Sequence, residues 1–227
     1  MNIALLHALP LDGRMWEPQL PVLAGHKVHT PTLYGLGSGF DGWGLGVLQQ
    51  VPGKLVAVGA SMGGYTASAI ARLAPERLDG LVLVGSRADP DAPERRPLRE
   101  EWIRIAREQG GEGLWEAAAK NFFTPQADPA VVARAHEIVV EQDPEGLIRA
   151  ITAIRDRPDS TEAVTSGIPL LVVAGAEDHL ISAEVARELA AASPNGRAEV
   201  IEGCGHLPSM ERADEFNRIL TTFLDEL

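Results

Sequence analysis

The sequence predicts an α/β protein with a mostly parallel, doubly wound sheet of about six strands and one helical insertion. Short apolar runs alternate with helical patterns along most of the chain, and this alternation is interrupted once. Four of the runs are continuous stretches of Val, Leu, Ile and Ala, which is typical of strands buried on both faces of a parallel sheet. The runs cover residues 3–6, 27–29, 55–58, 81–84, 170–174 and 198–201.

The flanking elements follow from the same patterns. Residues 27–29 mix charged and apolar side chains, so we expect an edge strand there. A helix is expected over residues 62–73, because Ala74-Pro75 is a common helix stop. A last helix is expected over about residues 214–224, with one apolar stripe formed by Phe216, Ile219, Leu220 and Phe223.

The alternation is interrupted between residues 87 and 159, where no strand signal occurs. Four helical patterns lie there: two cover residues 98–106 and 114–122, and two begin at Asp128-Pro129 and Asp143-Pro144. In the last two, an N-cap aspartate precedes a proline at the first helical position. We therefore expect a core formed by residues 1–86 and 160–227, covered by a helical cap formed by residues 87–159.

The composition excludes several classes of protein. The chain has 227 residues and a formal net charge of −12, which disfavours binding to nucleic acid and to anionic membrane surfaces. No basic leader and no apolar span precede the first strand, so we expect a cytoplasmic protein. The single cysteine, Cys204, allows no internal disulfide and no zinc spacing, and we expect a buried thiol.

The segment Gly59-Ala-Ser61-Met-Gly63 carries the strongest local signal. It follows one predicted strand and opens one predicted helix, which is the context of a G-x-S-x-G nucleophile elbow. The turn must be sharp, so a side chain at Gly59 or Gly63 would collide with neighbouring backbone. The competing interpretation is a glycine-rich turn with a capping serine.

Two further segments follow predicted strands. Gly175-Ala-Glu-Asp178 ends the strand at 170–174 and offers Asp178, with Glu177 as the alternative acid. Gly203-Cys-Gly-His206 follows the strand at 198–201. The chain order Ser, Asp, His is the order expected of this kind of site, and all three lie at the carboxyl edge of the sheet.

These residue types fit nucleophilic catalysis. The hydroxyl of Ser61 is a weak nucleophile, so His206 must accept its proton, and the carboxylate must orient the imidazole. Two donors must stabilise the oxyanion: the backbone N–H of Met62 and one from the loop at residues 7–10. Aromatic residues of the cap, some of which must face the substrate, are Trp102, Trp115 and Phe122.

With these motifs the chain resembles the α/β-hydrolase superfamily along nearly its whole length. The closest resemblance is to the branch of small carboxylesterases, 3-oxoadipate enol-lactonase-like proteins and haloperoxidase-like proteins. His7-Ala-Leu-Pro10 is similar to the oxyanion loop of that branch, which implies Leu9 as the second donor. The match of Gly175 to Asp178 with the acid motif implies Asp178 rather than Glu177. Gly203 to Glu211 is similar to the family's histidine motif.

The sequence departs from the family pattern in places. Ala8 replaces a glycine, Ala60 replaces the usual His or Gln, and Thr32 stands where Asp is common. The chain begins at what is normally the third strand, which predicts a compact sheet. Residues 39–53 are short for the helix usually found there.

The leading hypothesis is a serine hydrolase that cleaves small carboxylic esters and needs no metal or organic cofactor. An enol-lactonase, or a C–C bond hydrolase or lyase of the same fold, is the alternative within enzymes. A ligand receptor without catalytic activity is the alternative from another class. The expected partner is a small ester or lactone, and the oligomeric state does not follow from the sequence.

Overall fold

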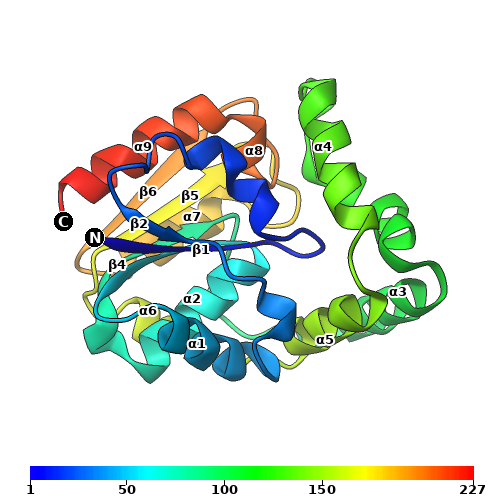
Figure 1. Cartoon of the computed structure of the whole chain (residues 1–227), viewed down its shortest axis with the longest axis horizontal. Helices are drawn as coiled ribbons and strands as arrows, with labels where there is room; N and C mark the ends of the chain where they lie inside the picture. The colour runs from blue at the N-terminus through cyan, green and yellow to red at the C-terminus, as the bar shows by residue number, and fades with distance from the viewer.

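A computed structural model describes the whole chain, residues 1–227, and shows one sheet between two layers of helices (Figure 1). All six strands are parallel, in the order β2-β1-β3-β4-β5-β6. They are β1 (Asn2–Leu6), β2 (Lys27–His29), β3 (Leu55–Ala60), β4 (Leu78–Val84), β5 (Leu170–Gly175) and β6 (Gly196–Ile201). Each predicted strand is present, and the mixed strand β2 lies at an edge as expected.

The strands bury both faces, because alternate residues enter two separate hydrophobic cores. Ala57 and Leu83 pack toward one layer, which holds α1 (Gly39–Gln50), α2 (Met62–Leu73) and α7 (Ala183–Ala191). Val58 and Val84 pack toward the other layer, which holds the 3₁₀ helix η1 (Gly13–Gln19) and α9 (Ala213–Asp225). This two-sided burial explains the continuous apolar runs.

Residues 39–50 form the 12-residue helix α1, within the segment 39–53 that is short for the helix usual in the family. Phe40, Trp43 and Val47 are buried on one side of it. α1 packs against α2, and a Cβ at Gly44 would make an ordinary van der Waals contact with Ile70 at 3.5 Å. Tertiary packing thus stabilises a helix that four glycines disfavour locally.

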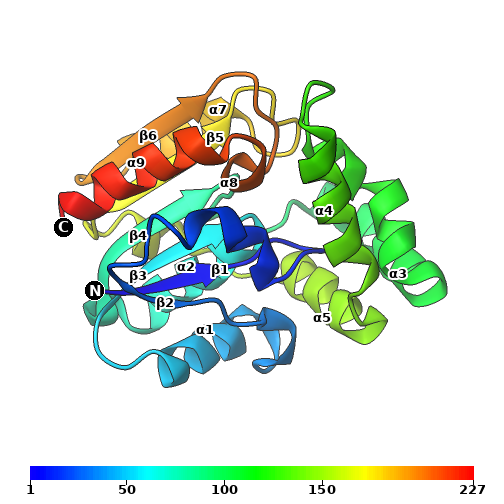
Figure 2. The ribbon, with the colours of Figure 1, turned by 45° about the horizontal axis from the view of Figure 1, so that its top comes forward.

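The helices of residues 87–159 lie beyond the carboxyl ends of the strands (Figures 1 and 2). They are α3 (Arg96–Ala117), η5 (Ala119–Phe122), α4 (Pro129–Val140) and α5 (Pro144–Arg155). The separate helices predicted at 98–106 and 114–122 correspond to the two halves of α3, which are divided at Gly110, with η5 continuing the second half. α3 bends at Gly110, whose φ of 62° is not helical. α4 and α5 begin at the predicted aspartate caps: Asp128 accepts from Ala130 N and Asp143 from Gly146 N.

Short helices complete the chain: η2 (Leu33–Gly35), η3 (Pro75–Arg77), η4 (Pro93–Arg95), α6 (Thr161–Val164) and α8 (Pro208–Glu211). No helix combines the length and the apolar character that crossing a membrane requires. The fold places the loops after β1, β3, β5 and β6 at one edge of the sheet, facing α3, α4 and α5.

Candidate active site

Ser61 lies at a strained turn between β3 and α2. Its φ of 48° and ψ of −111° are unusual for a residue with a side chain, and such backbone strain costs about 1–3 kcal/mol. Both backbone groups of Ser61 are held: its N–H donates to Val84 O at 2.8 Å, and its carbonyl accepts from Ser86 Oγ at 2.9 Å. The surrounding structure therefore fixes the direction of the serine side chain.

The two flanking glycines are required by close backbone contacts. A Cβ at Gly59 would lie 2.3 Å from Gly63 O, and a Cβ at Gly63 would lie 2.0 Å from Leu6 O. Neither position has space for a methyl group. The turn is as sharp as the sequence predicted.

Ser61, Asp178 and His206 meet at the carboxyl edge of the sheet, although they are distant in the chain. His206 Nε2 lies 2.9 Å from Ser61 Oγ, and His206 Nδ1 lies 2.7 Å from Asp178 Oδ2. A carboxylate only accepts hydrogen bonds, so Nδ1 carries the proton and Nε2 accepts from the serine hydroxyl. Glu177, the alternative acid, is exposed to solvent.

The Asp178 carboxylate is held ionised by its surroundings. Its second oxygen, Oδ1, accepts hydrogen bonds from Leu180 N at 2.8 Å and Ile181 N at 3.0 Å. Burial alone raises the pKa of Asp178, but the charge and hydrogen bond of His206 and the two backbone donors outweigh burial and lower it. The site can therefore stabilise an imidazolium at His206.

The loop that carries His206 is bonded to Phe122 and Thr124, which follow α3 in the chain. His206 N donates to Phe122 O at 2.7 Å, and the two rings lie 5.1 Å apart. Glu211 accepts from Gly205 N at 2.9 Å through one oxygen, and from Thr124 N at 2.8 Å through the other. Glu211 closes the histidine motif in the sequence, but the motif alone does not reveal its bond to Thr124.

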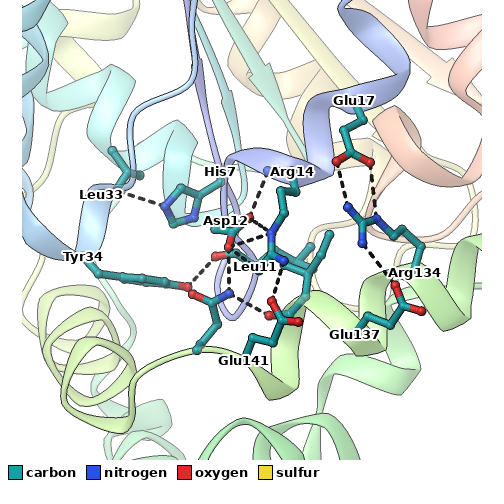
Figure 3. A network of polar contacts seen from close by, with 12 residues as sticks. His7, Leu11, Asp12, Arg14, Glu17, Leu33, Tyr34, Arg134, Glu137 and Glu141 are labelled. Carbon is teal, nitrogen blue, oxygen red and sulfur yellow. Dashed lines mark hydrogen bonds and ion pairs between the residues drawn. The ribbon is translucent and has the colours of Figure 1, made fainter.

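The loop after β1 lies beside the nucleophile. Leu9 borders the same cavity as Ser61 and His206, and its backbone N–H donates to no acceptor in the protein. His7 fixes the base of this loop: its Nε2 accepts from Leu33 N at 2.9 Å and its Nδ1 donates to Ala8 O at 3.1 Å (Figure 3). Met62, the other expected oxyanion donor, directly follows Ser61 at the first position of α2.

A cavity of about 210 Å³ opens above Ser61. Its wall includes two of the aromatic residues expected to face substrate, Trp102 and Phe122. The other residues that line it are Leu9, Tyr65, Arg95, Leu98, Arg99, Ile154, Leu180, Ile181 and His206.

Trp115 does not lie at this cavity. It lines a separate surface hollow and packs 4.8 Å from the ring of His136. The reason is the bend of α3 at Gly110, after which Gly111 packs directly against Val139 of α4. The second half of α3 thus faces α4 rather than the sheet edge.

The sequence interpretation missed most of the cavity wall. Tyr65 stands one helical turn after Ser61, and Arg95, Arg99 and Trp102 share one helical face, so spacing carries a usable signal for these residues. Ile154 and Leu180 reach the cavity only through tertiary packing.

The remaining candidates are the thiol of Cys204 and groups of metal-ligating side chains. Cys204 is fully buried, and burial raises the pKa of its thiol far above the usual value, with Glu211 adding to the effect. Such a thiol is a poor nucleophile. No group of three or more His, Cys, Asp or Glu side chains is placed to hold a metal ion.

Comparisons with known proteins identify the family of the chain. A family model described as "Alpha/beta hydrolase family" matches residues 3–219. A pimeloyl-[acyl-carrier protein] methyl ester esterase of Aliivibrio salmonicida is 28% identical, over 98% of this chain and 92% of its own. An esterase structure from Thermogutta terrifontis has a TM-score of 0.92 at 29% identity, over 100% of this chain and 90% of that one. The enol-lactonase of Burkholderia xenovorans has a TM-score of 0.83 at 28% identity, over 99% of this chain and 91% of that one. Because the family model spans nearly the whole sequence, the chain belongs to the α/β-hydrolase family.

Proposed function

We propose that this protein is a carboxylesterase that hydrolyses small carboxylic esters through an acyl-enzyme on Ser61. The observation that carries the proposal is the continuous hydrogen-bond chain from Asp178 through His206 to Ser61, with distances of 2.7 and 2.9 Å. These hydrogen bonds lead to Ser61 at a largely apolar cavity, which is large enough for a small acyl group. The three residues act as a catalytic triad.

Acylation uses the proton arrangement described above. His206 Nε2 takes the hydroxyl proton of Ser61 as Oγ attacks the ester carbonyl carbon. The ionised Asp178 stabilises the imidazolium. The backbone N–H groups of Leu9 and Met62 receive the oxyanion, and each such donor contributes about 3 kcal/mol to transition-state stabilisation.

Departure of the alcohol completes acylation, and attack by water then completes the reaction. His206 gives its proton to the leaving alcohol, which departs and leaves the acyl group on Ser61 Oγ. A water molecule then loses a proton to His206 and attacks the acyl carbon. The carboxylic acid is released as His206 returns a proton to Ser61 Oγ. Every proton transfer passes through one imidazole.

The relatives support the choice of an ester bond. The curated relative from Aliivibrio salmonicida is a methyl ester esterase, and the Thermogutta terrifontis structure is an esterase. Phe122, Trp102 and Ile154 from the cap helices give the cavity an apolar wall suited to an acyl chain. The helices of residues 87–159 therefore act as a substrate-covering cap.

An enol-lactonase is the second candidate. A lactone is a cyclic ester, so the same triad would open it, and the enol-lactonase of Burkholderia xenovorans shares 28% identity. A strong preference for lactones over p-nitrophenyl esters in steady-state rates would replace the first assignment with this one. A C–C bond hydrolase or lyase would turn over neither the lactones nor the p-nitrophenyl esters.

The deciding experiment uses a fluorophosphonate probe together with p-nitrophenyl acetate and butyrate. The wild type is expected to be labelled and active, and Ser61→Ala to lose both. In another protein, loss of the triad serine lowers kcat about a millionfold. Ser166→Ala is the matched control, because Ser166 is exposed and makes its side-chain bond only to Ala163 O.

Two results would contradict the proposal. An unlabelled wild type would mean that Ser61 is not a working nucleophile. A protein that binds a small ligand but neither reacts with the probe nor releases product would be a receptor on this fold.

A further inference from the structure

We infer that the active-site cavity selects esters that carry a second, anionic group, a carboxylate, held by Arg95. This inference rests on the proposed esterase function, because it names the substrate class of that same site. It starts from the charges on the cavity wall. Two arginines, Arg95 and Arg99, line the cavity, and no carboxylate does. The wall is therefore cationic in a protein whose net charge is −12.

Arg99 is already engaged within the protein. Its guanidinium forms a two-point contact with Asp91, at 2.9 and 3.0 Å, and lies 4.9 Å from the centre of the Trp102 ring. Asp91 also accepts from Arg157 at 2.8 Å. One carboxylate thus faces two guanidinium groups, and the side chains of all three are 7% exposed or less. The cluster keeps an uncompensated positive charge beside the cavity.

Arg95 is the cation left available for a ligand. It lies one helical turn before Arg99, at the end of η4 and the start of α3. It makes no ion pair and no side-chain hydrogen bond within the protein, and it is only partly exposed. A guanidinium presents paired N–H donors that match the two oxygens of a carboxylate. The positive charge that the neighbouring Asp91 cluster leaves uncompensated adds to the attraction of an anion at this position.

The nucleophile and the guanidinium border the same small cavity, so one ligand can contact both. Arg95, Ser61 and Leu9 line one space of about 210 Å³. A ligand that reaches both Ser61 and Arg95 within this space is short. The inferred substrate is a small half-ester, in which a few carbon atoms separate the scissile ester from the carboxylate.

The test compares two esters that differ in charge alone: monomethyl glutarate and its analogue with a carboxamide in place of the carboxylate. Hydrolysis is followed by proton release, so neither ester needs a chromophore. We expect the wild type to prefer the carboxylate ester by about tenfold in kcat/KM, the low end of the range for a hydrogen bond to a charged group. The preference is expected to shrink at high ionic strength.

Arg95→Gln is expected to bring the ratio of the two kcat/KM values close to one. Arg96→Gln is the matched control: Arg96 adjoins Arg95, is exposed, lies outside the cavity and changes the net charge equally, so that variant is expected to keep the wild-type ratio. A ratio within one protein is insensitive to a general loss of activity or of folded enzyme. Arg95→Lys, which keeps the charge but not the two-point geometry, is expected to keep part of the preference.

The outcomes separate the two claims. If wild-type enzyme labels with the fluorophosphonate and hydrolyses both esters equally well, the inference about Arg95 is overturned and the esterase proposal stands. The inference is also overturned if Arg95→Gln and Arg96→Gln lower the ratio to the same extent, since the effect would then be one of net charge. If neither ester is hydrolysed and no labelling occurs, the proposed function itself fails.

Discussion

His7 is completely buried at the base of the loop that carries Leu9, and both ring nitrogens have backbone partners. Because Nε2 must accept from Leu33 N–H, the ring has to be neutral (Figure 3). Burial lowers the pKa of His7 to about 4, and the bond to Ala8 O and the charge of Asp12 oppose this only in part. The histidine is a structural support of the oxyanion loop and takes no proton from substrate.

This pKa predicts how stability changes with pH. As the pH falls below about 6.5, the unfolded chain protonates His7 while the folded protein does not. The contribution of His7 is therefore complete above that pH and is lost progressively as the pH falls toward 4. A difference between 6.5 and about 4 corresponds to about 3 kcal/mol in the free energy of unfolding.

Urea denaturation of the wild type and His7→Gln between pH 7 and pH 4.5 measures this contribution. The glutamine can still accept from Leu33 N–H but does not titrate, so its curve against pH is expected to be flatter. Equal slopes for the two proteins would show that His7 titrates normally. As an independent check, the NMR signals of the His7 ring in the wild type are expected to stay those of the neutral Nδ1–H tautomer at pH 5.

The helices of the cap are held by two kinds of ion pair. α4 and Glu141, which directly follows it, are linked to η1 by exposed contacts: Arg134 pairs with Glu17 at 2.7 Å, and Glu141 pairs with Arg14 (Figure 3). The start of α3 is held instead by the buried Asp91, whose side chain is 2% exposed. Exposed pairs gain little because water screens them, whereas a buried pair leaves an uncompensated charge when one partner is removed.

We therefore expect Asp91→Asn to destabilise the protein by about 3 kcal/mol or more, since it leaves two buried guanidinium groups without a carboxylate. Glu17→Gln is expected to cost less than about 1 kcal/mol. Thermal and urea unfolding of both variants measure the difference. Similar small losses in the two variants would mean that water reaches the Asp91 cluster. A large loss in Glu17→Gln would mean that the contacts of α4 act as a cooperative network.

The sequence alone predicts those features of the molecule that depend on local sequence patterns, namely the strands and the motifs that follow them. The elbow at Ser61 and the glycine-flanked His206 follow buried strands, and parallel strands bring their carboxyl ends to one edge, so the site's location follows from strand order. The cavity wall could not be predicted in this way. Arg95 faces the cavity because of how α3 packs on α5 and α4, and Trp115 turns away because of one glycine bend. Periodicity identifies a helix face but not its neighbour.

Glu211 joins the two halves of the molecule at the site. One of its oxygens accepts from Gly205 N, directly before His206, and the other accepts from both N and Oγ1 of Thr124 in the cap. An amide in its place keeps only one acceptor oxygen, so its NH₂ group must face a backbone N–H on one side. Glu211→Gln therefore breaks the link between the cap and the histidine loop on one side, without adding or removing bulk.

We expect Glu211→Gln to lower kcat by about tenfold to a hundredfold, because a displacement of about 1 Å in a catalytic group has effects of that size. The rate of fluorophosphonate labelling of Ser61 is expected to fall in parallel, since both reactions need His206 in place, while KM changes less. Asp214→Asn is the control, as Asp214 is exposed on the neighbouring helix and forms no ion pair. If the variant only unfolds more easily, with labelling rate and kcat per folded molecule unchanged, Glu211 stabilises the fold and does not position the histidine. A parallel loss of both rates in correctly folded protein would instead show that the cap helps to hold His206 within hydrogen-bonding distance of Ser61.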